Sequence, residues 1–94
     1  MNRAEVVKFL EEENMRFSSR GTRFVCEMIE LLDSPDAEYT MMQLYATVAE
    51  KHKTTAKAVE RNVRYELTHA NKAVKSKEFI AKAAYKLGAS GWVI

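Results

Sequence analysis

Four polar side chains recur at three- and four-residue steps between positions 57 and 68, and their types suit contacts with nucleic acid. They are Lys57, Arg61, Arg64 and Thr68. At about 100° per residue, such steps place side chains on one face of a helix. A lysine there can neutralise a backbone phosphate, and an arginine can donate to O6 and N7 of one guanine. The spacing therefore predicts a cationic helix face that contacts double-stranded DNA.

An apolar stripe runs along the same predicted helix. Its members are Ala56, Val59, Val63, Leu67 and Ala70. The two stripes are centred about 130° apart around the helix axis, so one can face a core while the other faces a partner. An ordinary solvated face is the alternative interpretation, because Glu60 and Glu66 could pair with the arginines of the cationic stripe.

The residues before this helix indicate a helix-turn-helix over about 41–73. One apolar-faced helix ends near Ala49, and the polar segment 52–55 separates it from the next helix. Thr54 or Thr55 can cap that second helix through a hydroxyl oxygen. With arginines in the front half of the second helix, this layout places a recognition helix in the major groove of DNA.

The periodicity of the whole chain predicts an all-α fold, a single five-helix domain over residues 1–94 without strands. The helices are expected at about 3–13, 19–32, 41–51, 55–73 and 77–87. Asn2 and Glu5 are spaced as a capping box for the first helix. Ser76 is expected to cap the last helix and Gly88 to end it.

Several further residues are expected to decide how the helices pack. The core face of the third helix has four apolar candidates, Met42, Leu44, Tyr45 and Val48. Asn14 can adopt the left-handed backbone that ends a helix, and Gly21 can allow a close helix approach. The apolar tail 88–94 should fold back onto the body, with a protein contact around Trp92 as the alternative.

Composition and charge exclude some classes of protein. A chain of 94 residues with 47% hydrophobic side chains fits one domain, and its apolar runs are too short to span a membrane. The acidic N-terminal segment 1–14 does not resemble a signal peptide. The single cysteine, Cys26, cannot form an internal disulfide, so we expect a cytoplasmic protein with a buried thiol.

The net charge of +2 conceals a difference between the two halves of the chain. Residues 1–40 carry five basic and nine acidic side chains, a net charge of −4, whereas residues 41–94 carry ten basic and four acidic ones, a net charge of +6. The predicted helix-turn-helix lies in the basic half. This division favours a domain that presents one side to nucleic acid.

Motifs for catalysis or for small ligands are missing from the sequence. His52 and His69 have no second metal ligand at suitable spacing, and the three glycines build no phosphate-binding loop. The serines lie outside any nucleophile motif. We therefore expect neither an enzyme nor a catalytic residue, and no metal, cofactor or small-molecule substrate.

The helix-turn-helix also resembles a known family. Residues 45–51 read Y-A-T-V-A-E-K, and residues 54–64 read T-T-A-K-A-V-E-R-N-V-R. They are similar to the patterns Y-x-x-[IV]-A-x-K and T-T-A-x-x-V-E-R-x-[IV]-R in the DNA-binding effector domain of the sporulation master response regulator, stage zero sporulation protein A. Weaker similarity extends in order over most of residues 6–87.

The resemblance implies sequence-specific DNA binding in the regulation of transcription during sporulation, with Glu60, Arg61 and Arg64 reading the bases. A glutamate can accept a hydrogen bond from N4 of cytosine. Lys57 stands where the family has a small polar residue. The complete set of expected DNA-binding residues is Lys57, Glu60, Arg61, Arg64, Thr68 and Lys72.

Two departures from the family pattern affect what is expected of partners. The family's effector domain follows a phosphorylatable receiver domain, whereas this sequence begins at Met1 without one, so an excised domain and a stand-alone relative both fit. Only residues 71–75 join the recognition helix to the last helix, where the family has a longer connection.

A homodimer on tandem DNA half-sites is expected to bind more tightly than one copy. The alternative function is a protein–protein interaction module that keeps the fold without binding DNA.

Overall fold

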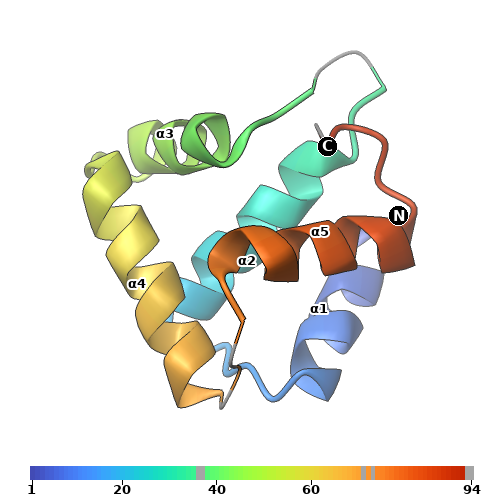
Figure 1. Ribbon diagram of the computed structural model, residues 1–94, viewed down its shortest axis with the longest axis horizontal. Helices are drawn as coiled ribbons and strands as arrows, with labels where there is room; N and C mark the ends of the chain where they lie inside the picture. Colours follow the sequence, from blue (N-terminus) through green and yellow to red (C-terminus); the bar gives the residue numbers. More distant parts are fainter. Residues whose placement is uncertain (36–37, 71, 73, 93–94) are drawn as a thin grey trace.

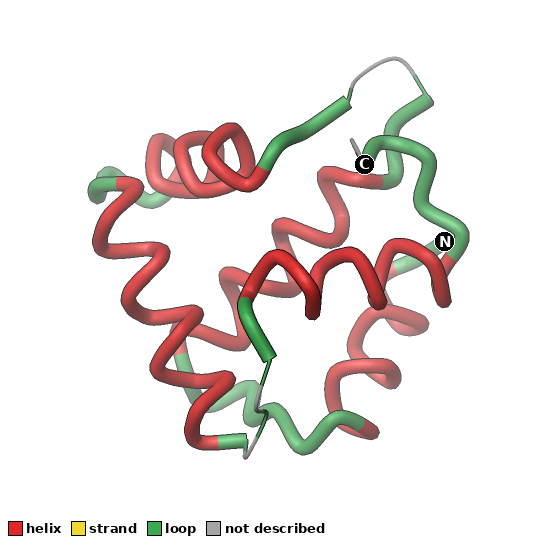
Figure 2. The backbone as a smooth tube through the Cα atoms, in the orientation of Figure 1, coloured by secondary structure: helices red, strands yellow, loops and turns green. Residues whose placement is uncertain are grey.

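Five helices make up most of the described chain. The computed structural model describes residues 1–35, 38–70, 72 and 74–92. Its helices are α1 (Arg3–Glu12), α2 (Arg20–Leu32), α3 (Met41–Lys51), α4 (Ala56–His69) and α5 (Ser76–Leu87) (Figure 1). The described residues form no strand, and their extended pairing is confined to one isolated bridge between Tyr39 and Trp92 (Figure 2). The predicted all-α, five-helix fold is confirmed.

Side-chain caps decide where α1 and α4 begin. Asn2 and Glu5 form the predicted capping box of α1, in which the Asn2 side chain accepts from the Glu5 N–H at 2.9 Å. Thr55, rather than Thr54, caps α4 and accepts from the Ala58 N–H at 3.1 Å. Each such cap satisfies a backbone donor that the first helical turn leaves unpaired.

The start of α5 differs from the prediction, whereas the left-handed residue at Asn14 and the stop at Gly88 are confirmed. Ser76 does not cap α5, because it is already the first helical residue and the N-cap position belongs to Lys75, whose side chain forms no capping hydrogen bond. Gly88 follows α5 with a φ of 70°, and Asn14 follows α1 with a φ of 65°. Both lie in the left-handed region that residues after a helix often adopt.

Helix α4 is shorter than predicted. It ends at His69, and the C-cap is Ala70. The N–H of Lys72 donates to the Leu67 carbonyl at 3.0 Å, and this five-residue step closes the last turn instead of extending it. The predicted end at position 73 itself lies outside the described residues.

The prediction of Met42 as a core residue is wrong. Its side chain is 70% exposed, whereas Leu44, Tyr45 and Val48 are buried as expected. Met42 is two positions from Leu44, about 200° around the helix, and therefore lies on the opposite face. Met41, four positions before Tyr45, packs against the core instead.

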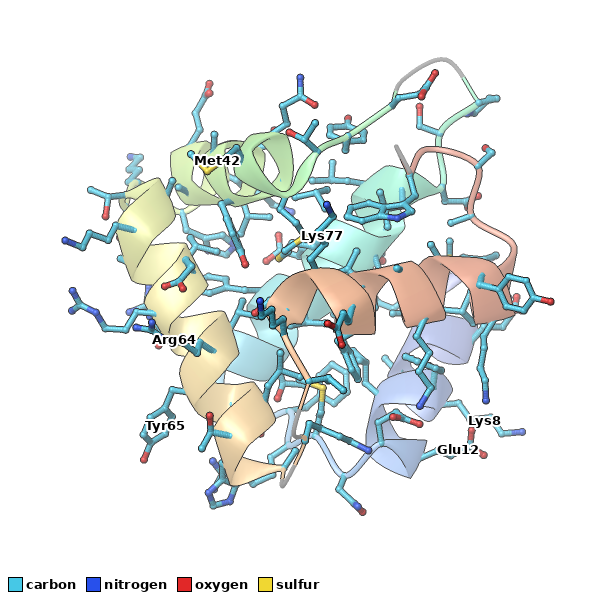
Figure 3. All side chains as sticks on the ribbon, viewed as in Figure 1. Lys8, Glu12, Met42, Arg64, Tyr65 and Lys77 are labelled. Atoms are coloured by element: carbon cyan, nitrogen blue, oxygen red, sulfur yellow. The ribbon has the colours of Figure 1, made fainter. Side chains whose placement is uncertain are left out.

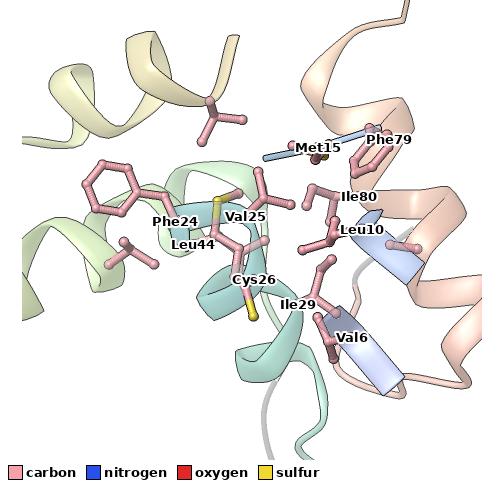
Figure 4. Close-up of a cluster of buried hydrophobic side chains, with 14 of the residues drawn as sticks. Val6, Leu10, Met15, Phe24, Val25, Cys26, Ile29, Leu44, Phe79 and Ile80 are labelled. Carbon is pink, nitrogen blue, oxygen red and sulfur yellow. The ribbon is translucent and has the colours of Figure 1, made fainter. Parts of the chain in front are cut away.

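Helix α2 lies at the centre of the fold and contacts each of the other four helices (Figure 1). It supplies six apolar side chains that are at most 2% exposed: Phe24, Val25, Cys26, Met28, Ile29 and Leu32. Around them, Leu10, Leu44 and Phe79 converge from α1, α3 and α5 (Figure 4). Full burial of one such side chain stabilises the fold by about 1.5–3 kcal/mol, so the helices are held in fixed orientations around α2.

The approach of α2 to α4 is close because Gly21 carries no side chain. A Cβ atom at this position would lie 2.3 Å from the carbonyl oxygen of Asn62 and 2.8 Å from Cβ of Glu66. Only glycine permits this distance between the two helices. The close packing expected at Gly21 is confirmed, and it fixes which face of α4 turns inward.

The described part of the tail folds back onto the body, as predicted. The N–H of Gly91 donates to the Leu32 carbonyl at 2.8 Å, and the N–H of Tyr39 donates to the Gly91 carbonyl at 2.7 Å. Trp92 is half-buried against the core. The last two tail positions, 93 and 94, lie outside the described residues. None of the described helices is long and apolar enough to cross a membrane.

Candidate nucleic-acid interface

A tight turn joins α3 to α4. Ala49, at the end of α3, is buried, and its carbonyl accepts from the N–H of Thr54 at 2.9 Å. Lys53 adopts the left-handed backbone with a φ of 55°, which reverses the chain between the two helices. Thr55 then caps α4. These features form the predicted helix-turn-helix, although the left-handed residue was not predicted, because lysine carries no preference for that conformation.

The two stripes predicted on α4 face opposite environments. Val59 and Val63 have no exposed surface, and Leu67 and Ala70 are at most 6% exposed. The cationic stripe is exposed at all four positions, Lys57, Arg61, Arg64 and Thr68. Figure 3 shows Arg64 at the surface of α4 and Tyr65 on the side of this helix that faces away from the other helices. The cationic face defined by these four stripe residues is therefore available to a partner.

Ion pairing leaves part of the cationic face free. Glu60 is half-buried, and its carboxylate lies 3.6 Å from Nη1 of Arg64, one helical turn further along. The Thr68 hydroxyl donates to the Arg64 carbonyl at 3.0 Å. Within the described ranges, Lys57 and Arg61 form no ion pair. A partner can therefore reach both cations without first breaking an ion pair.

Lys72 lies apart from the cationic face in the structure. Its Nζ is 3.0 Å from Oε1 of Glu13, and the Nζ of Lys82 is also 3.0 Å from this oxygen. Burial raises the pKa of the Glu13 carboxyl, but the hydrogen bonds from Lys82 and Lys72 outweigh that effect and hold the pKa below its ordinary value. The ammonium of Lys72 thus ties the end of α4 to the end of α1.

Glu66 has a structural role that differs from the pairing considered from the sequence. It is fully buried, and it pairs with Arg16 of the α1–α2 connection instead of an arginine of the cationic face. The spacing of Glu66 could have indicated that it is buried, because position 66 lies three residues after Val63 and four before Ala70. That register belongs to the apolar stripe.

A second acidic residue, Glu27 of α2, anchors the turn of the helix-turn-helix. Its carboxylate lies 2.7 Å from Nζ of Lys51 and 2.5 Å from Nε2 of His52. Burial raises the pKa of Glu27, but the hydrogen bonds from Lys51 and His52 outweigh it and lower the pKa overall. The His52 ring also packs edge-on against Phe24. Sequence spacing could not reveal this contact, because the partners are more than twenty positions apart.

The described residues provide no grouping suited to metal chemistry. Among them, no cluster of three or more His, Cys, Asp or Glu side chains could hold a metal ion. The Cys26 thiol is buried, and this burial raises its pKa, which disfavours the nucleophilic thiolate. The arrangement can therefore offer cationic and hydrogen-bonding contacts, but not an activated thiol.

Comparison with known proteins assigns the fold to a family. The family model described as sporulation initiation factor Spo0A C terminal matches residues 6–88, a span that includes most of α1 and all of α2 to α5. Neither the curated proteins nor the solved structures gave a match. The family is a non-enzymatic, DNA-binding effector of transcription in sporulation. With more than half of its length matched, the chain belongs to the family of the C-terminal domain of sporulation initiation factor Spo0A.

Proposed function

We propose that this chain binds a specific sequence of double-stranded DNA, with α4 in the major groove, and thereby regulates transcription. The observation that carries the proposal is the division of α4 into two faces. Val63 and its apolar neighbours are buried against the other helices, while Lys57, Arg61 and Arg64 project outward. A recognition helix needs one face held rigidly and another free to enter the groove.

The side chains of α4 differ in the contacts that they can make. Arg61 can donate to both guanine acceptors, since no described acid holds its guanidinium. Arg64 can make the same contact, and its partner Glu60 can accept from cytosine N4. Lys57 can neutralise a phosphate, and Thr68 can donate to a base or a phosphate.

Lys72 is the remaining proposed contact, and its ion pair with Glu13 is shorter and more buried than the pair of Arg64 with Glu60. Its ammonium must leave Glu13 to reach a phosphate. Lys82 would remain beside Glu13 and keep that carboxylate paired. Of the six proposed residues, we therefore expect Lys72 to contribute least to DNA affinity.

The test is a binding selection on random duplex DNA at moderate salt concentration. Enrichment of one sequence motif supports specific recognition. Recovery without an enriched motif would reduce the function to sequence-independent binding, and no recovery at all would refute DNA binding. A variant with Arg61→Ala and Arg64→Ala, carried through the same selection, should enrich no motif.

We further infer that two copies occupy adjacent half-sites, because one helix reads only a few base pairs and a single small domain binds weakly. The measurement is a mobility-shift titration on duplexes that carry one or two copies of the selected motif. Steeper binding to the tandem site supports dimerisation on DNA. Equal affinity and equal steepness on both duplexes would contradict it.

A second candidate function is protein binding, favoured by an apolar groove away from α4. The side chains of Ala84, Tyr85 and Trp92 line this groove, and Tyr85 is 88% exposed. Exposed aromatic residues of this kind are common in protein contacts. Tyr85→Ala separates the two functions, since it should leave DNA affinity unchanged if α4 alone reads the DNA.

A further inference from the structure

A groove lies along one flank of the cationic face of α4, where α3, α4 and the start of α5 meet. Six of its lining residues carry a side-chain hydrogen-bond donor: Tyr45, Arg64, Thr68, Lys75, Ser76 and Lys77. Arg64 and Thr68 belong both to this groove and to the cationic face. Figure 3 shows Arg64 on α4 and Lys77 near the start of α5, on either side of it. A ligand in the groove would therefore lie next to anything bound by α4.

The charges that line the groove favour an anion. Arg64, Lys75 and Lys77 contribute three positive charges, and Glu60 contributes one negative charge, which leaves a net charge of +2. Nη1 of Arg64 lies 3.6 Å from Oε1 of Glu60, so this carboxylate already compensates part of the arginine charge. Lys75 and Lys77 are exposed and form no ion pair with a described residue, so both can turn toward a bound anion.

The start of α5 adds backbone donors to these cations. Lys75 occupies the N-cap position without a side-chain capping bond, so the first N–H groups of this twelve-residue helix, beginning at Ser76 and Lys77, keep their donor capacity. The N–H of Phe79 is the first to pair within the helix, with the Lys75 carbonyl at 3.0 Å. Such N–H groups and the positive end of the helix dipole favour phosphate.

The Tyr45 hydroxyl adds a donor inside the groove. Tyr45 lines the groove from the α3 side, and only 8% of its surface is exposed. Its phenol lies near Ser76, Glu60 and Arg64, and a hydrogen bond with Ser76 offsets part of the effect of burial on its pKa. Burial is the main influence on its pKa, which is raised, so the phenol stays protonated and can donate.

We propose that this groove binds a backbone phosphate of the same DNA duplex that α4 reads. The inference rests on the proposed function. Lys75 and Lys77 neutralise the phosphate, the first N–H groups of α5 donate to it, and the Tyr45 hydroxyl completes the set. A contact of this type fixes the position of the protein along the duplex without reading sequence. It would hold α4 in register for base contacts by Arg64.

The experiment compares matched variants on two duplexes, one with the selected motif and one with an unrelated sequence, over a series of salt concentrations. The test variant is Lys75→Ala with Lys77→Ala. The control is Lys8→Ala with Lys86→Ala, which removes two exposed lysines that line a different groove beside α1. Figure 3 shows Lys8 on the opposite side of the molecule from Arg64.

For the test variant, the slope of log affinity against log salt should fall by about 2, because each lysine lost from a phosphate removes close to one unit. The affinity should fall by the same factor on both duplexes, and the control variant should keep the wild-type slope. Tyr45→Phe should weaken binding to both duplexes by roughly tenfold, as expected for a lost hydrogen bond to a charged group.

Three results overturn the proposal. If the wild-type protein binds and the test variant keeps its slope, the groove holds no phosphate, while the proposed function stands. If the test variant loses affinity for the selected duplex alone, the lysines read bases instead of the backbone. If the wild-type protein binds neither duplex, the proposed function is refuted, and so is the proposal that the groove binds a DNA phosphate.

Discussion

The Glu66 carboxylate, fully buried on α4, is held by Arg16 from the connection between α1 and α2. Nη2 of Arg16 lies 3.0 Å from Oε1 of Glu66, and the backbone N–H of Arg16 donates to Oε2 at 3.2 Å. A buried charge is tolerated only with such compensation. Because α4 also touches α2 at Gly21, two contacts on its inner side fix how its cationic face is presented.

The ionised form of Glu66 should make stability depend on pH. Burial raises the pKa of this carboxyl, but the hydrogen bonds from Arg16 outweigh it, so the pKa in the folded state lies below the ordinary value, as it does for Glu27 and Glu13. Unfolding returns the pKa of each group to about 4.3. The stabilisation is therefore complete above that pH and is lost as the pH falls through the folded-state values.

Denaturant unfolding between pH 3.5 and pH 7 measures this dependence. The free energy of unfolding should decline below about pH 4.5. Glu66→Gln should lower stability at pH 7, because Arg16 loses its charged partner, and it should reduce the steepness of the decline. A Glu66→Gln protein with the wild-type stability and the wild-type pH profile would show that the pair with Arg16 is unimportant.

Gly21→Ala should destabilise the fold. Alanine improves helix propensity by about 1 kcal/mol, but its Cβ would press against the backbone oxygen of Asn62, and overpacking of this kind costs about 3 kcal/mol. We expect a net loss of about 2 kcal/mol in the free energy of unfolding, measured by denaturant titration. Gly88→Ala is the control, since nothing lies near its Cβ and only its left-handed backbone is strained, at about 1 kcal/mol. Equal effects at the two glycines would contradict the close contact.

Short-range patterns predicted most of the fold. The stripes of α4, the capping box at Asn2 and the stop at Gly88 depend on residues within a few positions of one another, so periodicity and cap chemistry reveal them. The partner of Glu66 could not be predicted, because Arg16 is fifty positions away and tertiary packing alone brings the two together.

The candidate site shows the same division between local and distant information. The exposure of Lys57 and Arg61 followed from their angle relative to the apolar stripe. The groove that includes Lys75 and Lys77 could not be predicted from the sequence, because it depends on where the start of α5 packs beside α4. The pairing of Lys72 with Glu13 depends likewise on how the connection to α5 passes α1.

Val63→Asp should unfold the domain. Val63 has no exposed surface and lies in the middle of the apolar stripe, where an unpaired carboxylate costs about 4 kcal/mol or more. Circular dichroism should show loss of helix and of a cooperative thermal transition. Tyr65→Asp, two positions further along the same helix at a site that is 69% exposed, should keep both. A folded, cooperatively melting Val63→Asp protein would mean that α4 packs differently.

The most direct test of DNA reading by α4 is the ratio of two affinities, for the selected duplex and for an unrelated duplex, in the wild-type protein and in Arg61→Ala. Arg61 is exposed and forms no ion pair with the described residues, so its truncation should leave the thermal melt unchanged. The loss of a base contact worth about 1–3 kcal/mol should reduce the ratio by roughly 5- to 150-fold. An unchanged ratio in a folded Arg61→Ala protein would contradict sequence reading by this face of α4.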